Sequence, residues 1–117
     1  MDNFLFTDLI EIKSHEILGE THLKFYAGTD NNQCGTIDFI SEKINFHISC
    51  KRNIFKGMVS IKNITIVYKL GRLVFILKDK KDLSFNCSSQ TFEIMNAHIQ
   101  RYKDSGYSQD MKNAFIQ

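Results

Sequence analysis

The sequence predicts an α+β domain: a single antiparallel, strongly curved sheet, or a small β-sandwich or half-barrel, of about six or seven strands, packed by one C-terminal helix. Apolar and polar residues alternate with a period of two over much of residues 22–87, which is typical of strands that bury one face. After Cys87 the apolar spacing changes to three and four residues, which indicates a helix. The length of 117 residues suits a single domain over residues 1–117.

Strands are expected between about residues 9 and 87. Residues 43–50 alternate most clearly, and residues 23–27 and 83–87 repeat the pattern. Residues 64–69 and 73–78 are apolar on both faces, which is typical of central strands, and Leu70-Gly71 between them predicts a tight hairpin turn. Further turns are predicted at residues 29–32, 41–42 and 79–82.

The helix is expected over about residues 89–104. Ser88 and Ser89 can cap its first turn, and Gly106 would end it. Its apolar stripe begins at Phe92 and ends at Tyr102, and a further short helix is predicted over residues 108–115. Residues 4–18 fit a helix or a strand, and we favour a strand from about Leu9.

Composition indicates a cytoplasmic protein. The N-terminus is acidic and lacks the basic region of a secretory signal. The longest apolar run, residues 73–77, is five residues long, far short of a membrane-spanning helix. Three widely spaced cysteines predict free thiols and a reducing compartment, and nothing in the sequence indicates a cofactor.

Catalytic and metal-binding patterns are weak. His47 and Cys50 form an H-x-x-C pair, but residues three apart on a strand face opposite sides, so we expect no metal site, with Cys50 and Cys87 buried and His47 on the surface. Cys34 is the cysteine expected to be exposed, in a loop, where a nucleophile would need a base that no motif supplies. His98, like His15 and His22, is expected at the surface or a boundary. The sequence therefore predicts no enzyme, although a site assembled from distant residues stays open as an alternative.

Charge is unevenly distributed along the chain. Residues 1–50 have a balance of −5, residues 51–81 a balance of +8 and residues 82–117 a balance of −1. The positive segment can present a surface to an anionic partner, or its lysines can protect strand edges and pair with acids of the first half.

The first functional hypothesis is a non-catalytic protein-binding module, whose partner would be a toxin or an enzyme. Its size and composition resemble those of small bacterial inhibitor or immunity proteins, which cap the active site of a toxin. A basic nuclease-type toxin would then meet the acids of the first half, namely Glu11, Glu16, Glu20, Asp30, Asp38 and Glu42.

The alternative hypothesis is an anion-binding module for nucleic acid or anionic lipid. Several strands followed by one helix is similar to the element order of pleckstrin-homology-like domains, which bind phosphoinositides, although the tryptophan common in their helix is missing here. Phe55 beside basic residues is the candidate for stacking on a base. The candidate anion-binding residues are Lys51, Arg52, Phe55, Lys56, Lys69, Arg72, Lys78, Lys80 and Lys81.

Overall fold

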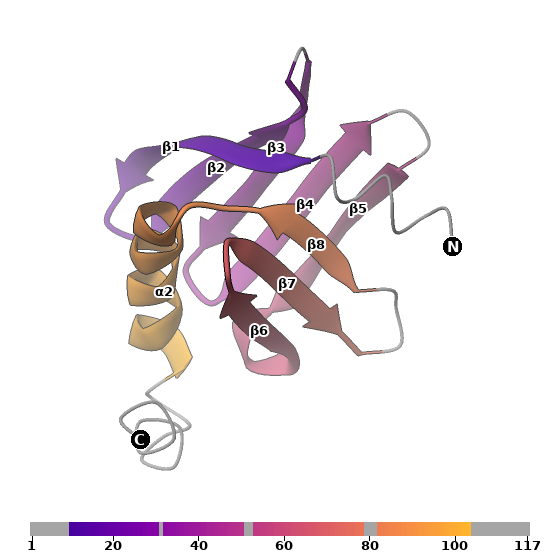
Figure 1. Ribbon diagram of the computed structural model, residues 1–117. Helices are drawn as coiled ribbons and strands as arrows, with labels where there is room; N and C mark the ends of the chain where they lie inside the picture. The colour runs from indigo at the N-terminus through magenta and orange to yellow at the C-terminus, as the bar shows by residue number, and fades with distance from the viewer. Residues whose placement is uncertain (1–9, 31, 51–52, 79–81, 104–117) are drawn as a thin grey trace.

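The computed structural model describes residues 10–30, 32–50, 53–78 and 82–103, which form an α+β fold with one mixed sheet and a C-terminal helix (Figure 1). The predicted class is confirmed. The predicted short helix over residues 108–115 lies outside the described residues. The elements are β1 (Glu11–Gly19), β2 (His22–Gly28), β3 (Gln33–Ile40), β4 (Lys43–Cys50), β5 (Asn53–Ser60), the 3-10 turn η1 (Ile61–Asn63), β6 (Ile64–Lys69), β7 (Arg72–Leu77), β8 (Leu83–Asn86) and α2 (Ser89–Lys103).

The described residues give eight strands in the order β5-β4-β3-β2-β1-β8-β7-β6, so the prediction of six or seven antiparallel strands needs two corrections. First, β1 and β8 run parallel, joined at Glu11 and Asn86, where the Asn86 amide donates to the Ile10 carbonyl at 2.9 Å. Second, the described strands number eight, because β3 and β5 carry no clear period of apolar residues in the sequence: a bulge interrupts β3, and β5 turns the apolar Ile54 and Met58 toward solvent.

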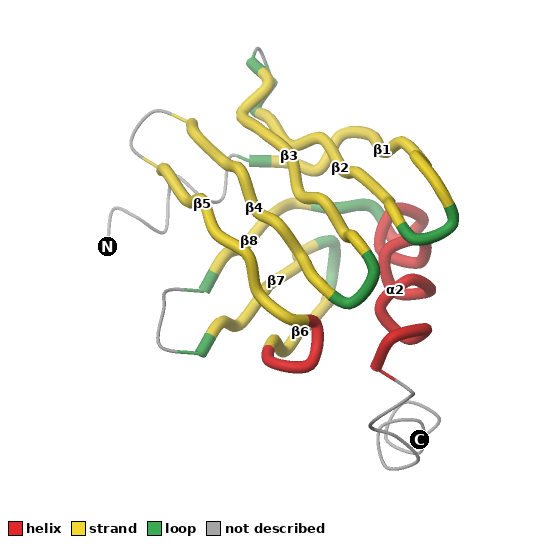
Figure 2. The backbone as a smooth tube through the Cα atoms, turned by 180° about the vertical axis from the view of Figure 1, so that it is seen from behind, coloured by secondary structure: helices red, strands yellow, loops and turns green. Residues whose placement is uncertain are grey.

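The sheet folds back over itself, so that its two halves enclose the core (Figure 2). Phe46 on β4 and Phe75 on β7 are far apart in the strand order, yet their rings meet edge to face with centroids 5.2 Å apart. Both side chains are fully buried, together with Phe25 and Phe39. Since phenyl rings need no hydrogen-bond partner, they fill this interior without a polar cost.

The turn at Leu70-Gly71 is observed where the sequence predicts it. Lys69 pairs with Arg72, and the two turn residues have φ values of 53° and 80°. Positive φ at both central positions is the type I′ geometry, whose twist suits a two-residue hairpin. The turn at residues 41–42 is also observed, with Ser41 at φ 54°.

Helix α2 begins after Ser88, whose hydroxyl accepts from the Thr91 amide at 3.1 Å. Met95 and Ile99 are buried in the core, as the apolar stripe predicts. Near the C-terminal end of the helix, Lys103 is also buried and donates to the Ile64 carbonyl at 3.0 Å, and burial lowers the pKa of its ammonium group. The helix therefore packs against one end of the folded sheet (Figure 1).

His98 is buried, which corrects the prediction of a surface or boundary residue. Its Nε2 lies 3.0 Å from the Ser41 carbonyl oxygen, so this nitrogen carries the donated proton. The ring packs between Phe39 and Tyr102, with centroid distances of 5.6 and 5.0 Å. Burial lowers the pKa of His98, since the charged form loses its hydration.

Candidate functional site

The cysteines do not form a nucleophilic site. Cys34 and Cys50 are joined by a disulfide, with Cα atoms 4.9 Å apart. Ala27 pairs with Gly35 and Gly28 with Gln33, so Cys34 is the extra residue of a bulge and turns inward, where it is buried. The predictions of an exposed loop thiol at Cys34 and of free thiols are therefore wrong at this pair, and the cysteines no longer argue for a reducing compartment.

Cys87 is the free cysteine of the described residues and is buried, as predicted. Burial raises the pKa of its thiol to about 11. Because the thiolate is the reactive form, the buried thiol is poorly suited to act as a nucleophile at neutral pH.

The described part of the chain does not bring together a set of metal ligands. His47 is exposed on the outer face of β4, whereas Cys50 faces the core and is bonded to Cys34. Within the described ranges, no group of three or more His, Cys, Asp or Glu side chains is close enough together to hold an ion. The H-x-x-C pair thus has an ordinary structural explanation.

The candidate acids do not form one cluster, but two pairs of them are close in the structure. Glu16 and Asp38 flank Lys24 in the register of β1, β2 and β3. Asp38 is 9% exposed and is used inside the molecule, since it accepts from His22 at 3.0 Å and lies 3.9 Å from the Lys24 ammonium. Glu16 accepts from the Tyr26 hydroxyl at 2.6 Å, and this bond raises the pKa of the tyrosine. Glu11 lies on β1 and Asp30 in the turn before β3. Glu20 and Glu42 lie in two neighbouring turns, which are joined where the Ser41 amide donates to the Thr21 carbonyl at 2.7 Å.

Only some of the candidate basic residues lie within the described part of the chain. Lys51, Arg52, Lys80 and Lys81 lie outside the described residues. Phe55 is half-buried and packs edge to face on Phe46, with centroids 5.3 Å apart, so it offers no free ring for a nucleobase. The remaining bases lie on β5 (Lys56), on either side of the β6–β7 turn (Lys69 and Arg72) and after β7 (Lys78).

One long segment of the chain combines positive charge with exposed apolar residues. Residues 43–78, from β4 to the end of β7, contain eight Lys and Arg and no Asp or Glu. Most of the large apolar side chains that the described residues expose also lie in this segment: Ile54, Met58, Val67, Leu70 and Ile76. Apolar contact area and basic charge therefore occur together here.

The hairpin β6–β7 presents part of this surface. Val67 pairs with Val74 and Thr65 with Ile76, so these side chains share the face turned away from the core. The sequence predicts two central strands because both faces are apolar, but β6 ends the strand order and this face is partly open to solvent. We call the set Val67, Leu70, Val74 and Ile76, with Lys69 and Arg72, the β6–β7 outer face.

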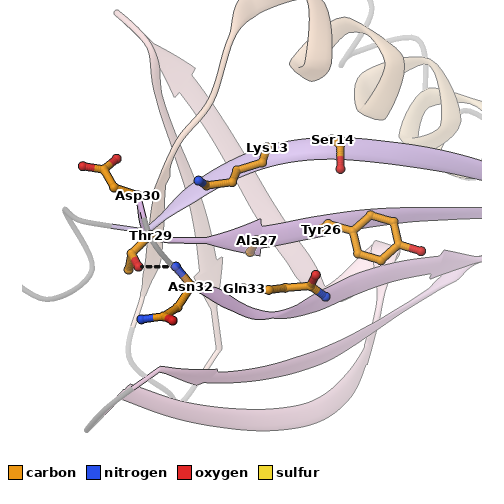
Figure 3. Close-up of a pocket in the computed structure, with 8 residues that line it drawn as sticks. All are labelled: Lys13, Ser14, Tyr26, Ala27, Thr29, Asp30, Asn32 and Gln33. Carbon is orange, nitrogen blue, oxygen red and sulfur yellow. Dashed lines mark hydrogen bonds between the residues drawn. The ribbon is translucent and has the colours of Figure 1, made fainter.

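A shallow pocket of about 440 Å³ lies at the opposite end of the sheet from α2 (Figure 3). A β-bulge places Lys13 at its rim, facing the turn that contains Asp30. The Asn32 amide donates to the Thr29 hydroxyl at 3.3 Å and shapes this turn. The lining side chains are Lys13, Ser14, Tyr26, Ala27, Thr29, Asp30, Asn32 and Gln33, which include neither the imidazole nor the thiol that acid–base or nucleophilic chemistry commonly uses.

No helix in the described ranges has the length and apolar character needed to cross a membrane. Comparisons of the chain with protein-family models, with curated proteins and with solved structures find no match, so its function has to be argued from its own geometry.

Proposed function

We propose that this chain is a non-catalytic protein-binding module and that its β6–β7 outer face docks on an acidic partner. The observation that carries the proposal is Leu70. This side chain is 94% exposed and stands at the tip of the hairpin, with Lys69 and Arg72 on either side.

Leu70 is unfavourable for the fold in two ways. Its φ of 53° is in the left-handed region, which costs a residue with a Cβ roughly 1–2 kcal/mol and which Asn or Gly would occupy more easily. Its side chain gains almost nothing from burial, because it is almost fully exposed. A residue that is costly in both respects is better explained by what it contacts outside the chain.

The charge of the surface indicates the chemistry of the partner. Neither β6 nor β7 carries an acid, and Lys69 and Arg72 flank the turn between them, so the apolar side chains of the β6–β7 outer face lie beside positive charge. An acidic protein surface with exposed apolar residues is complementary to this face. A toxin-neutralising inhibitor is one form of the proposal, and its target would then be acidic where it meets the β6–β7 outer face, because Lys69 and Arg72 flank the turn of that face.

Nucleic acid is the weaker alternative. Binding to single strands depends on exposed aromatic rings beside basic residues, and the candidate ring, Phe55, packs against Phe46. Positive charge alone supports salt-sensitive, sequence-independent binding.

The test compares the chain with its Leu70→Asn variant. Each is crosslinked in an extract of the organism that encodes it, and captured proteins are quantified by mass spectrometry. We expect at least a roughly tenfold loss of an acidic partner with Leu70→Asn, as for a central apolar contact. Leu18→Asn is the matched control because it removes another exposed leucine, from β1, and should keep the partner.

Two results would contradict the proposal. In the first, Leu70→Asn captures the same partners as the unchanged chain. In the second, the chain binds an oligonucleotide with an affinity that falls steeply with salt and captures no protein, which would favour the anion-binding alternative.

A further inference from the structure

Within the described residues, the strand β5 forms an uncovered edge of the sheet. It ends the strand order and, among the described strands, pairs with β4 alone over residues 53–60. In an edge strand, alternate residues direct their N–H and C=O groups away from the sheet, where another strand can bind them. Both views place α2 at the other side of the sheet from β5 (Figures 1 and 2).

The other edge, β6, is treated differently. Lys103 of α2 donates to the Ile64 carbonyl at 3.0 Å, and Phe92 stacks on Tyr68 with centroids 4.5 Å apart. The helix thus engages both ends of β6 and obstructs a further strand there. As far as the described ranges go, the contrast leaves β5 as the edge that is accessible for pairing.

The outward face of β5 has a specific pattern. Ile54 and Met58 are 65% and 55% exposed, and Lys56 between them is also exposed. Their register with Ser49, His47 and Asn45 on β4 places all three side chains on the solvent side of the sheet. A strand added beside β5 would set every second side chain next to this apolar–basic–apolar row.

A second copy of the chain fits this edge poorly. Two-fold antiparallel pairing centred on β5 would bring the two copies of Lys56 close together, and like charges on facing strands are destabilising. Residues 43–78 offer no acid to relieve the repulsion. The occupant favoured by charge is a foreign, acidic segment.

We infer that β5 binds an extended segment of a partner protein as an additional strand, and that this segment has the pattern apolar–x–acid–x–apolar. Backbone hydrogen bonds along the edge supply affinity, and the acid beside Lys56 with apolar residues beside Ile54 and Met58 supplies specificity. The inference rests on the proposed function in one respect, that the partner is a protein, but it uses a different strand.

The test uses the full chain and the synthetic peptide Thr-Ile-Thr-Glu-Thr-Ile-Thr. Binding is measured by fluorescence anisotropy, and the amide protons of β5 are followed by NMR hydrogen exchange. We expect binding that slows exchange at alternate residues of β5. Lys56→Glu should weaken it at least about tenfold and should bind the peptide with Lys in place of Glu better than the unchanged chain does. Lys62→Glu, the same charge change in η1, should alter the affinity less than about twofold.

Three outcomes would overturn the inference: binding that is indifferent to Lys56→Glu, binding without protection of β5, or outward β5 amides that are already protected in the free chain. Loss of peptide binding in Leu70→Asn rather than Lys56→Glu would place the site on the β6–β7 outer face, so the proposed function would stand and the inference would fall. If Lys56→Glu inverts the charge preference for the peptide while Leu70→Asn captures its protein partners unchanged, the inference stands and the proposed function falls.

Discussion

The two ends of the sheet are secured by different chemistry. At the helix end, α2 reaches over two turns: His98 bonds to the Ser41 carbonyl, and Arg101 donates to the Glu20 carbonyl at 2.9 Å. At the opposite end, a disulfide between Cys34 and Cys50 links β3 to β4. The helix end depends on long-range packing, and the opposite end depends on a covalent bond and on local backbone geometry. Substitutions at the two ends should therefore lower the stability of the fold for different reasons.

The largest effect is expected at the disulfide end, from Gly35→Ala. Gly35 has φ +148°, and an added Cβ would meet the His47 carbonyl oxygen and lie 2.9 Å from the Ile48 Cα. Because backbone cannot move aside as a side chain can, we expect a loss of at least about 3 kcal/mol in the free energy of unfolding, measured with urea. Gly19→Ala is the control, since its Cβ meets nothing within 4 Å. Equal effects of the two substitutions would contradict this account.

Removal of the disulfide should come next. Cys34 and Cys50 are 16 residues apart, and closing a loop of that length stabilises a fold by about 3 kcal/mol in the chain-entropy account. A Cys34→Ala, Cys50→Ala double variant should lose about that amount, and reductant should destabilise the unchanged chain but not the variant. Thermal unfolding with and without reductant measures both. If reductant leaves the unchanged chain as stable as before, the bond contributes nothing.

The helix end should respond to pH through His98. Because the folded-state pKa of His98 is lowered, the unfolded chain binds its proton first, and stability should fall as pH drops below the ordinary histidine range. His98→Gln keeps a donor for Ser41, should cost about 1–2 kcal/mol at pH 7, and should flatten the decline between pH 7 and pH 5. Urea unfolding at both pH values, with exposed His47→Gln as control, checks this. A decline as steep in His98→Gln would assign the effect to other groups.

The smallest effect has the opposite sign. Leu70→Asn should raise the free energy of unfolding by about 0.5–1 kcal/mol, because Asn accepts the left-handed conformation more easily. Leu70→Ala removes the exposed side chain beyond Cβ but keeps a Cβ in the left-handed conformation. It therefore separates the effect of the exposed apolar side chain from the effect of the backbone conformation, and should change the free energy of unfolding by less than about 0.5 kcal/mol. Differential scanning calorimetry measures both variants. A lower melting temperature for Leu70→Asn would show that the leucine supports the fold.

Local patterns explain what can be predicted. The strand at Lys43–Cys50, the turn at Leu70-Gly71 and the Ser88 cap each depend on neighbouring residues, so periodicity and turn chemistry are enough to find them. The apolar character of both faces of residues 64–69 and 73–78 is also visible in the sequence, where it predicts burial. The apolar residues of the β6–β7 outer face give the same pattern although that face is partly exposed. Only the strand order, in which β6 is an edge strand, distinguishes an exposed apolar face from a buried one.

Tertiary contacts explain what the sequence does not predict. Cys34 meets Cys50 because it is the extra residue of a bulge in β3, opposite Ala27 and Gly28 of β2, and such a bulge leaves no mark in the spacing of cysteines. His98 is buried because the Ser41 carbonyl and the ring of Phe39 converge on it from another part of the chain. The uncovered edge at β5 is likewise a property of the assembled sheet.

The parallel joint between β1 and β8 also bears on how the chain is made. Strands β1 to β5 pair with their sequence neighbours and can form as they leave the ribosome, whereas the second edge of β1 has no strand to pair with until Asn86 has been synthesised. Closing this joint pairs Glu11 with Asn86, and contacts between residues so far apart in the sequence slow folding. The nascent protein therefore carries an unpaired edge at β1, beside the apolar Ile10 and Ile12, until β8 has been made.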